Sequence, residues 1–176
     1  LTKYGISKDY VLVTLHRPSN VDEESVFSDI ISALEELSGN VEFVFPMHPR
    51  TKKMAEKFQL YGRIESISGM KITEPAGYLE FISLMSKSKL VLTDSGGLQE
   101  ETTALGIPCL TIRENTERPV TITQGTNQLV GTDRERIVQS GKEALQGHGK
   151  AGQIPKFWDG KTSARIVDVL LETIGN

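Results

Sequence analysis

The chain of 176 residues is long enough for one packed domain, since single domains cluster at about 100–200 residues. Its hydrophobic fraction of 38% and charged fraction of 24% are those of an ordinary globular protein and exclude a disordered chain. A net charge of −3 without a basic run argues against nucleic acid as a partner, and no segment reaches the ~18 apolar residues that a membrane span needs.

Short apolar runs alternate along the chain with segments whose apolar residues repeat at a spacing near 3.6. The helix over 21–37 is the best defined, because its apolar residues form one stripe and acidic residues 22–24 stand at its start, where the helix dipole favours anions. In chain order the expected elements are strand 10–15, helix 21–37, strand 41–47, helix 52–59, strand 64–72, helix 77–87, strand 89–93, helix 97–104, strand 108–112, helix 134–145 and helix 163–174.

This alternation predicts an α/β fold, a Rossmann-like parallel sheet with helices on both faces. Sheets of this kind bind ligands beyond the carboxyl ends of their strands, so the loops that follow the strands are the candidate sites. Residues 146–153 are expected to form a surface loop, and residues 1–176 to form a single domain.

The single cysteine, Cys109, lies in an apolar run, so it is expected to act as a buried small hydrophobe. The absence of an intramolecular disulfide and of an apolar signal-peptide core favours a cytoplasmic location. The chain starts at Leu1 without Met, which suggests a piece of a longer polypeptide, although a processed tag explains it equally well.

The loop 93–97 follows an apolar strand and precedes a predicted helix. Gly96 and Gly97 allow a ligand to approach the backbone closely, and the first N–H groups of the helix would point at an anion such as a diphosphate. The alternative is that Asp94 or Ser95 merely caps the helix and the glycines form a turn. Neither the dinucleotide nor the Walker A spacing is present, so the loop alone leaves both interpretations open.

Glu100 and Glu101 follow within the first turn or so of that helix, where one carboxylate can face the crevice and accept the hydroxyls of a ribose. The alternative is that both are solvated residues favoured by the helix dipole.

Two histidines follow strands that end at the same edge of the sheet, His16 with Arg17 after the first strand and His48 after the second. Histidine can transfer protons near neutral pH and arginine can pair with phosphate, which favours a site over two structural histidines. The polar run 113–119 also follows a strand. Its arginines can reach phosphate oxygens, or they can form local ion pairs in a surface loop.

Taken together, these motifs resemble the non-hydrolysing UDP-N-acetylglucosamine 2-epimerases in order and spacing, over nearly the whole chain. In that family two Rossmann-like domains of the GT-B type face each other across a cleft, and this chain corresponds to the C-terminal domain. The motifs that carry the resemblance are His16-Arg17, His48-Pro49 and residues 94–101, 116–119 and 125–131.

The resemblance implies that Ser95, Gly96 and Gly97 hold the diphosphate of UDP. It places Glu101 at the ribose hydroxyls, Arg118 at a phosphate and Phe81 at the uracil. These six residues form the implied UDP site.

By the same resemblance His16 is similar to the family's active-site histidine, and Arg17 and His48 lie at the sugar or at a second UDP-sugar that activates bacterial members. The reaction implied is elimination of UDP from UDP-GlcNAc and its re-addition with inverted C2, which gives UDP-ManNAc without a cofactor or metal. Ser19, Arg50 and Val120 depart from the family pattern in the neighbourhood of these motifs.

The family's main acid and base carboxylates belong to the N-terminal domain, which this chain lacks, so the chain alone is expected to be inactive. The expected partners are UDP, UDP-GlcNAc, the N-terminal domain of the same polypeptide and, as a further option, a second copy in a homodimer. Three alternatives stay open, namely a hydrolysing UDP-GlcNAc 2-epimerase, a GT-B glycosyltransferase domain and a nucleotide-binding module without catalysis.

Overall fold

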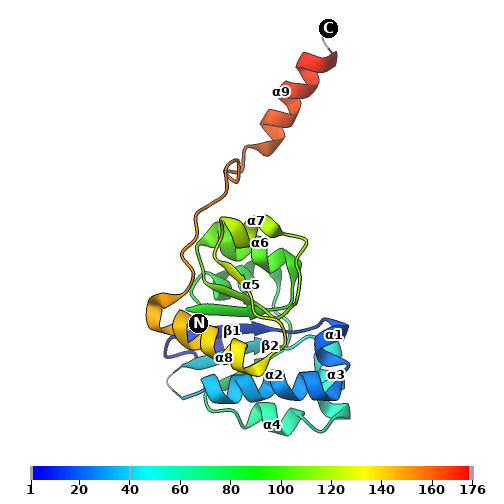
Figure 1. The fold of residues 1–176 in the computed structure, drawn as a ribbon, viewed down its shortest axis with the longest axis vertical. Helices are drawn as coiled ribbons and strands as arrows, with labels where there is room; N and C mark the ends of the chain where they lie inside the picture. Colours follow the sequence, from blue (N-terminus) through cyan, green and yellow to red (C-terminus); the bar gives the residue numbers. More distant parts are fainter. Residues whose placement is uncertain (1, 40, 175–176) are drawn as a thin grey trace.

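The computed structural model describes residues 2–39 and 41–174, and within them the strands form one six-stranded sheet (Figure 1). Every neighbouring pair runs parallel, in the order β3-β2-β1-β4-β5-β6. The predicted parallel sheet is therefore confirmed. The strands are β1 Tyr10–Thr14, β2 Glu42–Pro46, β3 Met70–Thr73, β4 Leu90–Thr93, β5 Cys109–Thr111 and β6 Asn127–Leu129.

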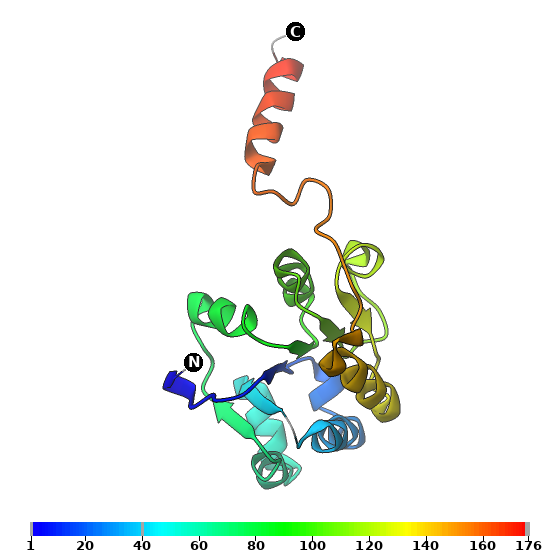
Figure 2. The same ribbon diagram turned by 90° about the vertical axis from the view of Figure 1, so that its left-hand side faces the viewer.

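Helices cover both faces of the sheet, with α5 and α6 on one side and α2, α3 and α4 on the other (Figure 2). In β1, Val11 and Val13 pack toward the α2 side and Tyr10 and Leu12 toward the α5 side, and all four are buried. A strand buried on both faces needs a continuous apolar run, which is the pattern of this segment. The helices are α1 Pro18–Val21, α2 Glu24–Leu37, α3 Pro49–Lys57, α4 Tyr61–Glu65, α5 Tyr78–Met85, α6 Gly96–Leu105, α7 Pro119–Thr123, α8 Arg134–Glu143 and α9 Thr162–Ile174, with a 3₁₀ turn at Thr2–Tyr4 and a π turn at Ala144–His148.

Two predicted elements need correction. The strand expected over 64–72 begins only at Met70, because Ile64 belongs to α4 and is buried in the core from a helix. The helix expected from residue 21 begins at Glu24, since Val21 ends the separate helix α1. Of the acidic residues 22–24, only Glu24 therefore stands in the first turn of α2.

Four short elements were not predicted, namely α1, α4, α7 and β6. Each has three to five residues, too few for an apolar period to emerge. In β6 the buried residue is the polar Asn127, so hydropathy carries no signal of a strand there.

The strand order creates a crevice between β1 and β4. The chain leaves β1 toward α2 on one face and leaves β4 toward α6 on the other, so the two loops diverge at the carboxyl edge. In open parallel sheets this point of divergence is where ligands bind.

Cys109 is buried, as predicted, and burial raises the pKa of its thiol to about 11. None of the helices in the described ranges has the length and apolar character to cross a membrane.

The last helix, α9, stands apart from the sheet (Figure 1). It forms where the apolar spacing predicts a helix, yet it has no buried residue and covers neither face. Its apolar side chains stay at least half exposed, among them Ile166, Val169 and Leu170. The segment before it does pack, since the Gln153 N–H donates to the Gln124 carbonyl at 2.8 Å.

We expect the domain to fold without α9. Deleting residues 162–176 should change the free energy of unfolding by less than about 0.5 kcal/mol, because the helix buries nothing against the sheet. As a control, Leu34→Ala in the fully buried face of α2 should cost about 2–5 kcal/mol. Urea denaturation of the three chains measures both values, and a loss above about 2 kcal/mol on deletion would show that α9 supports the core.

Candidate functional site

One buried carboxylate, that of Asp94, holds the loop after β4 against the loop after β1. Its Oδ2 atom accepts hydrogen bonds from the backbone N–H groups of His16 and Arg17, at 2.9 and 2.8 Å, and from Asn20 Nδ2 at 3.2 Å. The buried Asn20 amide also donates to the Ile112 carbonyl just beyond β5, at 2.8 Å. The ends of β1, β4 and β5 are therefore tied together at the carboxyl edge.

The second oxygen of this carboxylate orients the His16 ring and favours one of its tautomers. Asp94 Oδ1 lies 2.8 Å from His16 Nδ1, and among the described residues it receives a hydrogen bond only if that nitrogen carries a proton. A buried acceptor without a donor is costly, so the Nδ1–H form of the imidazole is favoured. The His16 ring, 39% exposed, then keeps Nε2 as the nitrogen open to a ligand.

Four of the predicted site residues line one cavity of about 240 Å³ at this edge, namely His16, His48, Phe81 and Ser95. They come from the loops after β1, β2 and β4 and from α5. The rings of His16 and His48 lie 5.6 Å apart between centroids. The structure thus brings together residues that span 80 positions of the sequence, as the parallel strand order requires.

The first turn of α6 faces this crevice. Ser95 takes the N-cap position, but its side chain makes no capping hydrogen bond, and its backbone N–H donates to Thr93 Oγ1 at 3.0 Å. The Asp94 side chain points to the β1 loop instead. Ser95 is therefore the N-cap by position without a capping hydrogen bond from its side chain, and Asp94 is not the cap. A Cβ at Gly97 would meet no atom within 4 Å, so the backbone here is open to a ligand.

A second buried polar group positions the loop that carries Arg118. Gln99 Oε1 accepts hydrogen bonds from Thr116 Oγ1 at 2.5 Å and from Asn127 Nδ2 at 3.1 Å. Gly125 allows this packing, because a Cβ there would lie 2.3 Å from Thr103 Oγ1. The loop after β5 is therefore anchored to α6 and β6.

Carboxylates pair with the arginines around the first turn of α6. Arg118 Nε lies 3.1 Å from Glu100 Oε2, and Arg113 pairs with Glu117 through both guanidinium nitrogens. Arg17 Nε donates to the Asp94 carbonyl at 3.3 Å. The run 113–119 therefore does contain local ion pairs, and those pairs lie at the candidate site.

Glu101 is half-buried on α6, whose first turn contains no acidic residue, so Glu100 and Glu101 lie one turn later than expected. Burial is the main cause that raises the pKa of Glu101, with Glu100 adding to it and a hydrogen bond from Tyr78 opposing it. The ionised form of this carboxyl is therefore disfavoured in the free chain.

His48 also has a structural role, since it caps α3 by accepting the Arg50 N–H at its Nδ1, 3.1 Å away. The Arg50 side chain turns outward and pairs with Asp22, with Nε 2.9 Å from Oδ1. His148 is exposed in the π turn after α8.

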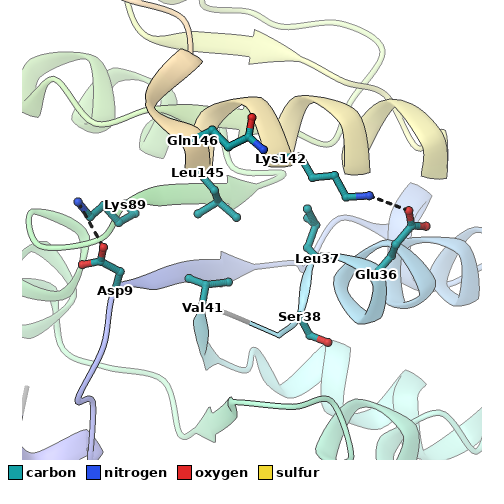
Figure 3. Close-up of a pocket in the computed structure, with 9 residues that line it drawn as sticks. All are labelled: Asp9, Glu36, Leu37, Ser38, Val41, Lys89, Lys142, Leu145 and Gln146. Carbon is teal, nitrogen blue, oxygen red and sulfur yellow. Dashed lines mark hydrogen bonds and ion pairs between the residues drawn. The ribbon is translucent and has the colours of Figure 1, made fainter.

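A larger hollow of about 450 Å³ lies at the opposite edge, where the strands begin (Figure 3). Its charged side chains neutralise one another, with Lys89 Nζ 3.4 Å from Asp9 and Lys142 Nζ 3.1 Å from Glu36. Parallel sheets bind ligands at the carboxyl edge. The smaller cavity is therefore the candidate site.

Sequence reasoning did not identify the roles of Asp94, Asn20, Gln99 and Asn127. Asp94 and Gln99 lie within the motif 94–101, and Asn127 lies within 125–131. The position of polar residues beside apolar strands was the one sequence signal that could have marked them as buried hydrogen-bonding groups. Their partners lie up to 92 positions away. Local patterns do not show such pairings.

Comparisons with known proteins agree with this geometry. The family model described as UDP-N-acetylglucosamine 2-epimerase matches residues 2–171. The UDP-N-acetylglucosamine 2-epimerase of Methanocaldococcus jannaschii is 41% identical over 94% of this chain, and the UDP-2,3-diacetamido-2,3-dideoxy-D-glucuronate 2-epimerase of Pseudomonas aeruginosa is 40% identical over 92%. The chain spans 45% and 44% of the length of these relatives.

A solved structure shows the same fold. The crystal structure of M. jannaschii UDP-GlcNAc 2-epimerase in complex with UDP-GlcNAc and UDP superposes with a TM-score of 0.85 at 40% identity, covering 96% of this chain and 46% of that one. The expectation of half of a GT-B fold is confirmed.

Asp94→Asn should lower the free energy of unfolding by about 2–4 kcal/mol, because the neutral amide weakens the acceptor of three hydrogen bonds and turns its NH2 group either against those donors or toward His16 Nδ1. The matched control is Asp133→Asn at the exposed N-cap of α8, which accepts one hydrogen bond from the Arg136 N–H at 2.8 Å. It should cost less than about 1 kcal/mol. Equal losses in chemical denaturation would contradict the role assigned to Asp94.

Proposed function

Because the chain belongs to the UDP-N-acetylglucosamine 2-epimerase family, we propose that it is the UDP-binding half of an enzyme that interconverts UDP-GlcNAc and UDP-ManNAc. The observation that carries the proposal is the cavity at the β1–β4 crevice, where His16, Phe81 and Ser95 meet beside an uncapped helix N-terminus. The M. jannaschii enzyme, whose structure holds UDP-GlcNAc and UDP, shares this fold.

The nucleotide binds with its diphosphate on Ser95, Gly96 and Gly97. The open face at Gly97 and the unfilled N–H groups of the first turn of α6 support this placement. Arg118, which is half-exposed and paired with Glu100, reaches a phosphate by exchanging its partner. Phe81 lines the cavity wall and provides the apolar surface for the uracil.

Glu101 accepts the ribose hydroxyls. It lies on α6, beyond the glycines that hold the diphosphate, which is the order in which a nucleotide presents its phosphates and ribose. The raised pKa of this half-buried carboxyl is consistent with a group whose solvation is completed by a ligand.

His16 is the catalytic residue of this half. With Nδ1–H held by Asp94, Nε2 faces the ligand side and can move a proton or support the charge on departing UDP. Inversion at C2 needs a base to remove the C2 proton and a donor to return one on the other face. A single imidazole cannot serve both faces, so carboxylates of the other half complete the reaction.

The N-terminal domain of the same polypeptide is the proposed partner. The chain spans 45% of the M. jannaschii enzyme, and α9 presents an apolar face that nothing in the described structure covers. Closure of two halves would also exclude water from the reacting sugar. A homodimer and a cytoplasmic location stay predictions, the second resting on the single buried cysteine.

The relatives of this chain differ in the sugar that they act on. The P. aeruginosa relative acts on a diacetamido-glucuronate and is as similar to this chain as the GlcNAc epimerases are, so the nucleotide half is compatible with either sugar. N-acetylglucosamine is preferred because the family description and the first two relatives carry it.

Glu101→Gln should lower the affinity for UDP about tenfold and the affinity for 2′-deoxy-UDP by less than about twofold, because only the ribose offers a 2′-hydroxyl to the carboxylate. Calorimetry with both nucleotides measures this ratio. Glu100→Gln is the control, since it faces Arg118 and should change both affinities equally.

The Glu101→Gln domain should keep its thermal midpoint. Its raised pKa means that the ionised form costs stability above that pKa, so a neutral amide removes no stabilising charge. Failure of UDP to bind the unmodified chain would contradict the proposed function, and equal losses for both nucleotides would show that Glu101 supports α6 instead.

A further inference from the structure

Arg113 lies just after β5, in the run 113–119 whose arginines the sequence offers to phosphate, but the proposed function uses only Arg118 of that run. The Arg113 side chain is only 10% exposed. Its Nη1 and Nη2 atoms donate to Glu117 Oε2 and Oε1 at 2.9 and 2.8 Å, and Nη2 also donates to Asn115 Oδ1 at 3.2 Å. The paired geometry is the one that guanidinium adopts with carboxylate or phosphate.

The partner carboxylate stands in front of the first turn of α6. Glu117 Oε2 would lie 3.7 Å from a Cβ placed on Gly96, the first residue of the helix. Arg113 is the main cause that lowers the pKa of Glu117 to about 2, and Arg17 contributes a smaller attraction. A fully ionised carboxylate therefore lies among two arginines and a helix N-terminus, which is an environment suited to an anion.

The two members of the pair differ in their freedom to move. Glu117 is 60% exposed, so its carboxylate can swing into solvent at little cost. The Arg113 guanidinium is enclosed and would be costly to leave without an anion. Any exchange at this pair therefore replaces the carboxylate and leaves the arginine in place.

We propose that Arg113 is a phosphate-binding residue that Glu117 masks in the free chain, and that a nucleoside diphosphate binds by displacing the Glu117 carboxylate. This inference rests on the proposed function, since it assumes that the diphosphate lies on residues 95–97. Phosphate carries more negative charge than a carboxylate and offers the same paired acceptors, so the exchange is favourable once the nucleotide is seated. Glu117 thereby competes for Arg113 and keeps weakly charged anions from binding there.

The Arg118–Glu100 pair does not carry the same inference. The Arg118 side chain is 47% exposed and that of Glu100 is 40% exposed, so water readily replaces either partner. Glu100 therefore does not block Arg118 from binding an anion.

The first test compares UDP affinity by calorimetry at fixed ionic strength in the unmodified chain, Glu117→Gln and Glu114→Gln. Glu114→Gln is the matched control, because the substitution removes the same charge from the same loop. The Glu114 side chain, however, lies beside Gly131 and not beside Gly96. Glu117→Gln should bind UDP about three- to tenfold more tightly, and Glu114→Gln should stay within about twofold. Unchanged or weaker binding by Glu117→Gln would overturn displacement.

The second test asks whether Arg113 itself contacts the phosphate. Arg113→Gln should lower UDP affinity about tenfold in the Glu117→Gln background and by a smaller factor in the unmodified chain, because there the lost phosphate contact is partly offset by no longer having to displace Glu117. If the loss disappears in that background, Arg113 serves only Glu117 and the proposal is wrong. Arg113→Lys, which keeps the charge but not the paired donors, should show a smaller loss and replaces Arg113→Gln if that variant fails to fold.

The outcomes separate this inference from the proposed function. UDP binding by both chains, tighter to Glu117→Gln than to the unmodified chain, would support both. Binding by neither would overturn both the diphosphate site and the masking, whereas equal binding by both would overturn the masking alone.

Discussion

The buried carboxylate of Asp94 is the constraint on which the candidate site depends. Parallel strands present their carboxyl ends at one edge, but the loops that leave β1 and β4 go to opposite faces. Asp94 joins them directly, by accepting from the His16 and Arg17 backbone, and Asn20 extends the connection to the end of β5. The same side chain orders the His16 imidazole, so the fold and the proposed proton-transfer group share one interaction.

Gln99 plays the corresponding part on the other side of α6. Its amide holds Thr116 and Asn127, which places the loop with Arg113, Glu117 and Arg118 beside the first turn of the helix. The site thus combines buried polar contacts, made by Asp94 and Gln99, with more exposed ion pairs of Arg113 and Arg118. The arginines can therefore exchange their partners while the buried contacts keep the loops in place.

Much of the fold could be predicted because buried parallel strands leave continuous apolar runs, as β1 and β4 do. The strand β6 could not be predicted, because Asn127 holds it by hydrogen bonds rather than by apolar burial. The edge shared by His16 and His48 followed from the alternation of strands and helices, whereas the contact of Asp94 with His16 joins positions 78 apart, which no local pattern records. For the arginines of the run 113–119 the sequence leaves phosphate binding and local ion pairs both open, and only the geometry places Glu117, the partner of Arg113, beside Gly96.

The central claim is that a nucleoside diphosphate binds at the carboxyl edge, on the first turn of α6, and not in the larger hollow at the other edge. The most direct measurement is a two-dimensional ¹⁵N–¹H NMR titration of the labelled chain with UDP. The account predicts the largest shifts at the backbone amides of Gly96 and Gly97, with Lys89 and Lys142 unchanged. Shifts confined to Lys89, Lys142 and their neighbours would contradict it.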